Sequence, residues 1–512
     1  MFSKVYSAGL QGIEGYLVQV EADVGDGLPG FHMVGYLAPE VREAQDRVRT
    51  ALKNAGIRLP PRKVTINLSP ADIRKDGTAF DLPVAVAVLA AYGMVGPAAL
   101  KGSAFIGELG LDGQVKPVRG VLPLVSALRD LGWKRCFLPV ENVPEGLAVG
   151  QIDIVKVKNV KQAMEWLADP GKIQKESIHE WLLAEGSQGY AYDFCEVNGQ
   201  RLIRRATEIA VSGQHNILYL GPPGSGKSMV AQRVPTIMPS LSREEQLEIS
   251  KIHSVCGMLP PGKALFNTRP FRAPHHTVSL QAMAGGGKYP KPGEVSLASR
   301  GVLFLDELPE YRREVLEILR QPLEDRKIMI SRVNGRYGFP ANFLLVAAMN
   351  PCPCGFYPDR SRCSCNERQI RRYLGRVSRP LLDRIDLCVE AAPATYGELR
   401  GDKENEPSQA IRERVERARE IQKRRFQGSG TFFNSAMGNR QVKQYCPLGA
   451  EEEDLLQRAF QGQRLSARGC QKILKVARTI ADMEGARQIG KSHLGEAVGY
   501  RSLEEKYWGK EG

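Results

Sequence analysis

One segment of the sequence constrains the fold more than any other. Residues 221–228 read Gly-Pro-Pro-Gly-Ser-Gly-Lys-Ser and fit the phosphate-binding pattern G-x-x-x-x-G-K-[ST]. The apolar stretch 216–220 precedes this pattern as an expected strand, and a helix is expected over residues 228–233. In a strand, loop and helix of this kind, backbone N–H groups surround phosphates. A chance glycine turn is the alternative, but the segment predicts a nucleotide-binding loop in an α/β domain.

Two side chains of this loop have specific expected tasks. The Lys227 ammonium reaches the β- and γ-phosphates of a nucleotide, and the Ser228 hydroxyl can ligate Mg²⁺. ATP and Mg²⁺ are therefore the expected cofactors. The residues expected to hold them are Gly221, Pro222, Pro223, Gly224, Ser225, Gly226, Lys227, Ser228 and Asp306.

An acidic pair follows a second apolar strand. Residues 302–305 are apolar and lead directly into Asp306 and Glu307. Two carboxylates at the end of a buried strand are costly unless a cation offsets their charge. Asp306 is therefore expected to bind Mg²⁺, and Glu307 to orient and deprotonate the attacking water. The alternative is a surface acidic pair, because Glu310 is also close.

A third apolar strand, residues 343–348, leads to Asn350. The Asn350 amide can contact the γ-phosphate or the water. It can equally be a turn residue before Pro351.

Together these motifs resemble a known family. The matching pieces are Asp193-Phe-x-x-Val-x-Gly-Gln200, the loop at 221–228, Leu305-Asp-Glu307, Ala348-Met-Asn350 and Leu381-Leu-Asp-Arg-Ile-Asp386. They are similar to the AAA+ module of the Mg-chelatase-like family, and most similar to its ComM/YifB group. The resemblance covers nearly the whole chain. It does not imply a chelatase, because that enzyme needs partner subunits and a porphyrin, and no porphyrin site is expected here.

The resemblance implies roles for two arginines and a homo-oligomer, most simply a hexamer. Arg384 would be the arginine finger inserted into a neighbouring subunit's site, and Arg468 the sensor-2 arginine of the helical lid. Without the family, an ordinary salt bridge and a surface charge would be preferred. Arg379 departs from the family pattern, in which a glycine is expected before Pro-Leu-Leu-Asp-Arg. The expected catalytic residues are Glu307, Asn350, Arg384 and Arg468.

The predicted fold class is α/β with three parts. Residues 1–165 are similar to the proteolytic domain of Lon, and 166–192 read as a linker. Residues 193–393 form the AAA+ core with a parallel sheet, and 394–512 form a helical lid. Lon-type proteolysis needs a Ser nucleophile and a Lys base. The corresponding positions here hold Ala79 and Leu122, so a non-proteolytic scaffold for ring assembly or DNA contact is expected.

Four cysteines cluster shortly after Asn350. Cys352 and Cys354 are separated by eight residues from Cys363 and Cys365. Four thiolates at such spacing can bind a structural Zn²⁺ ion tetrahedrally. Four reduced cysteines or a redox pair are the alternatives. The segment from Arg360 to Arg384 is basic, so it can face DNA or the acids of a neighbouring subunit.

A hairpin between the second and third strands is the candidate DNA contact. Residues 327–332 and 336–339 read as short strands joined by a tight Asn334-Gly335 turn. Lys327, Arg332 and Arg336 are its candidate phosphate-binding cations. The insert 269–291, with cations, histidines and three glycines, is a second candidate. A solvated surface is the alternative for both.

Charge and composition favour a soluble, cytosolic protein with a polyanionic partner. Lys and Arg total 71 against 57 Asp and Glu, giving a net charge of +14. The N-terminus lacks a signal-peptide pattern, and the longest apolar run, residues 82–95, is too short to span a membrane. Together with this charge, the resemblance to the ComM/YifB group implies a cytoplasmic DNA motor, a helicase or branch-migration factor in recombination or transformation. A protein-remodelling ATPase and an ATP-dependent protease are the rival hypotheses.

Overall fold

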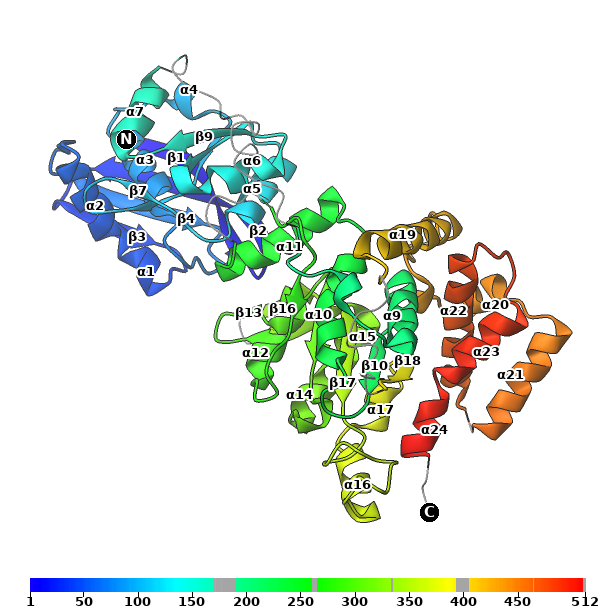
Figure 1. Ribbon diagram of the computed structural model, residues 1–512. Coiled ribbons are helices and arrows are strands. Elements are labelled where there is room, and N and C mark those ends of the chain that lie inside the picture. Colours follow the sequence, from blue (N-terminus) through cyan, green and yellow to red (C-terminus); the bar gives the residue numbers. More distant parts are fainter. Residues whose placement is uncertain are drawn as a thin grey trace. The chain divides into compact units, whose positions relative to one another are not determined.

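The computed structural model describes residues 1–169, 171, 176, 189–259, 265–332, 335–392, 405–463 and 465–509. Most of the expected linker, the Asn334 turn residue and residues 394–404 of the expected lid lie outside these ranges. The chain divides into two units, which are described separately (Figure 1). Unit 1 comprises Met1–Gln188 and Ser242–Asn267, and unit 2 comprises Gly189–Leu241 and Thr268–Gly512.

Unit 1 is built on a seven-stranded mixed sheet in the order β3-β4-β2-β1-β5-β8-β9. The long hairpin β1–β2 and strand β4 pair antiparallel, whereas the other neighbours are parallel. A small hairpin, β6–β7, forms around a turn at Asp112 and Gly113. The strands are β1 (Phe2–Gln11), β2 (Glu14–Gly25), β3 (Gly30–Val34), β4 (Lys63–Ser69), β5 (Ser103–Phe105), β6 (Glu108–Leu109), β7 (Val115–Lys116), β8 (Arg135–Pro139) and β9 (Asp153–Val157).

Helix α3 (Asp81–Ala91) forms the centre of the unit 1 core. It is apolar on all sides, and ten of its residues are buried, because it packs under β1 and β2. The other helices of this unit are α1 (Pro39–Arg42), α2 (Ala44–Asn54), α4 (Pro97–Leu100), α5 (Val121–Asp130), η1 (Val140–Asn142), α6 (Val143–Val149), α7 (Val160–Ala168) and α11 (Arg243–Cys256).

Helix α11 belongs to unit 1 although its sequence lies within the expected AAA+ range. The Ser254 carbonyl accepts a hydrogen bond of 3.2 Å from the Gly120 N–H at the start of α5. Arg243 donates to the Ala148 carbonyl at 2.6 Å, and Leu247 packs in the same apolar cluster as α5. Residues 242–267 therefore form an excursion of the chain from unit 2 into unit 1.

Unit 2 contains a five-stranded parallel sheet in the order β11-β14-β17-β10-β18. The central strands are buried along their whole length, as expected for parallel strands covered on both faces. Its strands are β10 (Ile217–Leu220), β11 (Phe271–Arg272), β14 (Val302–Leu305), β17 (Leu344–Met349) and β18 (Leu387–Glu390). Two hairpins lie outside this sheet, β12–β13 (Gly285–Gly286, Lys291–Pro292) and β15–β16 (Lys327–Arg332, Gly335–Pro340).

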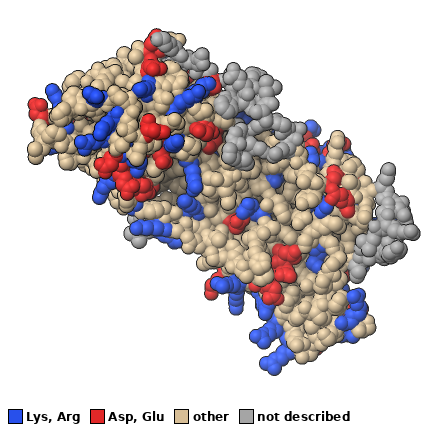
Figure 2. Space-filling model, turned by 60° about the vertical axis from the view of Figure 1, so that its left-hand side comes forward, with Lys and Arg blue, Asp and Glu red and all other residues tan. Residues whose placement is uncertain are grey.

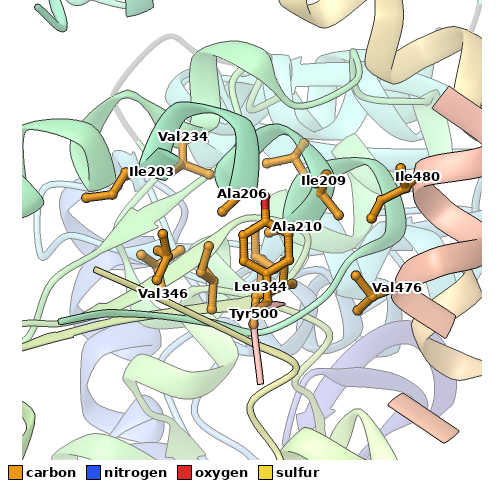
Figure 3. Packing of buried hydrophobic residues seen from close by; sticks show 14 of the residues in the cluster. Ile203, Ala206, Ile209, Ala210, Val234, Leu344, Val346, Val476, Ile480 and Tyr500 are labelled. Atoms are coloured by element: carbon orange, nitrogen blue, oxygen red, sulfur yellow. The ribbon is translucent and has the colours of Figure 1, made fainter. Parts of the chain in front are cut away.

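Helix α9 (Arg201–Gly213) joins the sheet of unit 2 to the C-terminal helices. Its apolar residues recur every three or four positions, so one side of the helix faces the core. Figure 3 shows Ile203, Ala206, Ile209 and Ala210 packed among residues of β17 and of α22. One apolar cluster therefore holds the parallel sheet and the C-terminal helices together.

The remaining helices of unit 2 continue the chain on both sides of this core. Before the C-terminal part they are η3 (Phe194–Glu196), α10 (Lys227–Ile237), α12 (Leu280–Ala284), α13 (Glu294–Leu297), η4 (Leu308–Glu310), α14 (Arg313–Ile318), α15 (Arg320–Asp325), α16 (Glu367–Leu374) and α17 (Arg379–Leu382). The C-terminal helices are α19 (Ser408–Arg425), η5 (Asn434–Ala436), α20 (Asn439–Tyr445), α21 (Ala450–Gly462), α22 (Ala467–Met483), α23 (Lys491–Gly499) and α24 (Ser502–Trp508).

The expected α/β class, with a parallel sheet and a helical C-terminal region, is confirmed. The similarity of the N-terminal unit to Lon stays a prediction. Among the described residues, no helix is long and apolar enough to cross a membrane.

A buried ionic network links the C-terminal helices. The carboxylate of Asp482, which is 2% exposed, accepts from Arg478 at 3.0 Å and from Arg425 at 2.6 Å. It also accepts from the Asn434 amide at 2.8 Å. The carboxylate thus connects α19, η5 and α22.

We predict that Asp482→Ala lowers the free energy of unfolding by about 3–5 kcal/mol, because Arg478 would stay buried without its counter-ion. Chemical denaturation followed by circular dichroism measures this change. The control is Asp454→Ala, which removes an exposed ion pair with Arg458 and should change stability little. Equal effects of the two substitutions would show that the buried network contributes no more to the free energy of unfolding than an exposed ion pair.

Candidate functional site

The glycine-rich loop lies at the carboxyl end of β10 and leads into α10. Gly224 and Gly226 have φ values of 74° and 80°, which glycine adopts without strain. A Cβ at Gly221 would come within 2.6 Å of the Ala391 carbonyl oxygen. The glycine pattern therefore reflects two needs, a tight turn around an anion and a close approach to the strand β18 region.

The Lys227 ammonium is buried inside this loop. It donates at 2.8 Å to the carbonyl oxygens of Gly221 and Pro222, and lies 3.3 Å from the Asn350 side-chain oxygen. Burial lowers the pKa of Lys227 to about 8, although the Asp306 carboxylate favours the charged form. A buried cation with mainly neutral partners fits an anionic ligand, so the loop suits the polyphosphate of ATP.

The side chains expected to bind Mg²⁺ lie together. The Ser228 hydroxyl donates to Asp306 at 2.6 Å, although the two residues are 78 positions apart. The other Asp306 oxygen accepts from the Glu307 backbone N–H at 2.9 Å. A hydroxyl and a carboxylate oxygen next to the lysine are ligands that Mg²⁺ accepts.

Glu307 has a left-handed backbone conformation, with φ of 50°, directly after β14. Its side chain is 59% exposed, and His276 Nδ1 lies 3.4 Å from its carboxylate. The rings of His275 and His276 lie 4.0 Å apart, and His276 also approaches Tyr311. The sequence placed these histidines in a candidate DNA-contacting insert, and no motif indicated their position beside Glu307.

Asn350 follows β17 at the same edge of the sheet. Its side-chain oxygen approaches Lys227, and the preceding carbonyl, that of Met349, accepts from the Gly221 N–H at 3.2 Å. Tyr373 of α16 lies beside the Asn350 backbone. The polar residues that follow strands β10, β14 and β17 thus lie close together.

Arg384 and Arg468 lie together at the opposite edge of the sheet. Both line a cavity of about 320 Å³ that also contains Asn216, the residue before β10. The Asn216 side chain donates to the Arg384 carbonyl at 2.9 Å. The P-loop begins at the other end of β10. A strand of four residues spans about 13 Å, so these arginines are remote from the P-loop of their own chain.

Arg384 is engaged within its own chain. Its guanidinium pairs with Glu324 at 2.7 Å and donates to the carbonyls of Arg320 and Pro380 at 3.1 and 2.6 Å. The salt bridge that the sequence left as an alternative is therefore present, whereas Arg468 is exposed on α22.

Comparisons with known proteins agree with this site. Three family models match the chain: "Magnesium chelatase, subunit ChlI" over residues 193–399, "Subunit ChlI of Mg-chelatase" over 20–142, and "Magnesium chelatase, subunit ChlI C-terminal" over 405–501. The chain is 41% identical to Competence protein ComM of Haemophilus influenzae, covering 98% of this chain and 97% of that protein. The uncharacterized protein YifB of Escherichia coli is 38% identical, covering 98% and 97%.

The chain belongs to the Mg-chelatase-like ComM/YifB family. Its identity to the magnesium-chelatase 38 kDa subunit of Rhodobacter capsulatus is only 23%, over 59% of this chain and 84% of that protein. Membership in this AAA+ family indicates an ATPase with ATP and Mg²⁺ as cofactors, which agrees with the nucleotide-binding loop.

This member of the ComM/YifB family also gathers its four clustered cysteines. The sulfurs of Cys352, Cys354, Cys363 and Cys365 all lie within 4.8 Å of one another. The Cys352–Cys354, Cys352–Cys363 and Cys354–Cys363 distances are 3.3, 3.8 and 3.5 Å. Tetrahedral Zn²⁺ with bonds of about 2.3 Å would separate its sulfurs by about 3.8 Å. The cluster therefore has the dimensions of a metal site.

The β15–β16 hairpin carries its cations on two different faces. Arg336 is paired with Ser331 and shares the exposed face of the ribbon with Lys327 and Met329, whereas Ile328 and Ile330 are buried on the other face. Arg332 points from the second face and donates to the Gly287 carbonyl at 3.2 Å. The hairpin and the glycine-rich insert thus form one structure (Figure 1).

We predict that ATP affinity falls about tenfold for each pH unit above pH 8. The free Lys227 ammonium titrates near pH 8, and a bound polyphosphate would raise its pKa, so binding above that pH requires proton uptake. Titration of a fluorescent ATP analogue between pH 7 and 9.5 measures the effect. In Lys227→Arg the cation stays charged and the dependence should disappear. The same dependence in both proteins would assign it to another group.

Proposed function

We propose that this protein is an ATP-hydrolysing ring motor that acts on DNA, as a helicase or branch-migration factor in recombination or natural transformation. The observation that carries the ATPase part is the convergence of Lys227, Ser228, Asp306 and Glu307 on one sheet edge. The DNA part is supported by the full-length similarity to a protein named for competence and by the exposed cations of the β15–β16 hairpin.

The site's own residues account for hydrolysis. Lys227 binds the phosphates, and the Ser228 hydroxyl and Asp306 carboxylate hold Mg²⁺, which neutralises developing phosphate charge when bound. Glu307 accepts a proton from the attacking water at its carboxylate. Asn350 orients the water or the γ-phosphate. His276, next to Glu307, can fix the carboxylate's position.

A ring of subunits completes the site. Arg384 and Arg468 line one cavity at the sheet edge opposite the P-loop, so they act on a nucleotide only if it is bound by another copy of the chain. In this proposal Arg384 leaves Glu324 when the neighbour binds ATP, and its guanidinium stabilises the transferring phosphoryl group. The proposal therefore includes a homo-oligomer, most simply a hexamer.

DNA binds at the exposed face of the β15–β16 hairpin. Lys327 and Arg336 share that face, and Met329, 42% exposed, lies between them with an apolar surface available to bases or sugars. Both strands that flank this hairpin in sequence, β14 and β17, end in the nucleotide site. A change in nucleotide state therefore has a short covalent route to the DNA contact.

Four-thiolate binding of a structural Zn²⁺ is also part of this proposal. Cys352 and Cys365 are buried, and the Tyr357 backbone N–H donates to the Cys352 sulfur at 3.4 Å. N–H donors to sulfur are usual around bound thiolates.

Positive side chains project from the lower end of unit 2 in Figure 2, the end that α16 occupies in Figure 1.

Two rival functions differ in testable features. A protein-remodelling ATPase would be stimulated by a polypeptide rather than DNA. An ATP-dependent protease would need a Ser–Lys pair at positions held by Ala79 and by Leu122, which is buried at the start of α5. A Lon-like but non-proteolytic unit 1 and a cytoplasmic location stay predictions.

We predict that Arg384→Ala protein binds ATP but hydrolyses it at least about a hundredfold more slowly, as expected on loss of a transition-state contact. Glu307→Gln should likewise bind and not turn over, because an amide accepts no proton from water. Mixing the two should restore activity, since a mixed ring contains some intact interfaces. No restoration, despite demonstrated subunit exchange, would contradict a role for Arg384 across the interface.

We predict that Arg336→Ala with Lys327→Ala weakens DNA binding on all sequences and lowers the salt-dependence slope by about two. DNA-stimulated ATPase should fall, while ATP binding stays normal. Lys443→Ala, an exposed cation on α20, is the control and should behave as wild type. If affinity, slope and stimulation are unchanged in the double variant, DNA binds elsewhere and the protein-remodelling hypothesis gains support.

A further inference from the structure

The cysteine cluster lies against the nucleotide loop. Gly355, buried between the two cysteine pairs, adopts φ of 86°, and its N–H donates to the Cys352 carbonyl at 3.0 Å. A Cβ placed on Gly355 would lie 2.3 Å from Cδ of Pro223 and 2.9 Å from its Cγ. The turn that the cysteines hold is therefore in direct contact with the outer side of the P-loop.

Two more connections join the cluster to the groups that hold phosphate. Asn350, two residues before Cys352, contacts the Lys227 ammonium at 3.3 Å. Tyr373 of α16, a helix that begins two residues after Cys365, lies beside the backbone of the same Asn350. Both the start and the end of the cysteine segment therefore lie next to Asn350.

The cluster also shares its core with the P-loop strand. Cys352 and Cys365 pack in the same apolar cluster as Leu218 and Leu220 of β10 and Met349 of β17. Without a metal ion, mutual repulsion of the thiolates or entry of solvent would move the four sulfurs apart. Pro223 and Asn350 would then lose the packing that this segment gives them. A metal ion would instead hold the four sulfurs in one arrangement.

We infer that Zn²⁺ bound by Cys352, Cys354, Cys363 and Cys365 fixes the outer wall of the P-loop, so that the metal sets the affinity for nucleotide. The inference rests on the proposed zinc site and on nucleotide binding at Lys227. The metal has no contact with the reacting atoms in this assignment. It acts on Pro223 and Asn350 through the turn at Gly355 and the Tyr373 contact.

The first experiment measures zinc and nucleotide affinity on the same full-length samples. Zinc per chain is determined by elemental analysis, and affinity by titration with a fluorescent ATP analogue in excess Mg²⁺. Protein as purified is compared with protein whose thiols have been titrated with a mercurial and freed of zinc, then reduced. One zinc per chain, at least tenfold weaker binding after removal, and recovery on adding Zn²⁺ are expected. Zinc that can be removed without any change in affinity overturns the inference but leaves the zinc site standing, and a chain that never holds zinc overturns both.

The second experiment separates the contact from the metal. Gly355→Ala should keep its zinc yet bind the ATP analogue at least tenfold more weakly, because the new methyl group displaces Pro223. Gly428→Ala is the matched control: Gly428 has φ of 75°, but a Cβ added there would meet nothing within 4 Å, so it tests backbone strain alone. Thermal unfolding checks that both variants are folded. Normal affinity in zinc-loaded Gly355→Ala protein overturns the inference even if the metal-free protein unfolds.

Discussion

All five strands of the second unit's sheet run in one direction, and this places the polar residues that follow them at a single edge. Lys227 comes after β10, Asp306 and Glu307 after β14, and Asn350 after β17. Burial of the Lys227 ammonium away from water disfavours its charge and lowers its pKa to about 8. An anion bound beside this buried ammonium would stabilise its charged form, so the site favours phosphate as a ligand.

Sequence reasoning succeeded where a rule is local. The strand, loop and helix around residues 217–237, the acidic pair after β14 and the apolar run of β17 all follow from spacing along the chain. It could not place contacts that depend on the tertiary fold. Nothing in the spacing of His276 indicates that it lies 3.4 Å from Glu307. Likewise, the pattern of a hairpin does not show that Arg332 bonds the Gly287 carbonyl while Arg336 faces away.

Helix α11 illustrates the same limit at the level of whole elements. Its amphipathic pattern and its Ser242 capping box identify a helix and the face that must be buried. They do not identify the partner, which is α5 in the other unit's sequence range. For Arg384 and Arg468, the family resemblance indicated function, but only the fold shows that both lie at the amino edge of the sheet.

The excursion of residues 242–267 limits how this protein can be divided into domain fragments. The chain passes between its two units near residues 188, 241 and 267, rather than through a single linker. A fragment that starts after the first crossing would carry α11 without α5, and a fragment that ends there would lack α11 and expose the apolar surface around Leu124 and Leu128. Two uninterrupted stretches of the chain therefore do not correspond to the two units. Separating them requires that the α11 segment be excised from one part and supplied to the other.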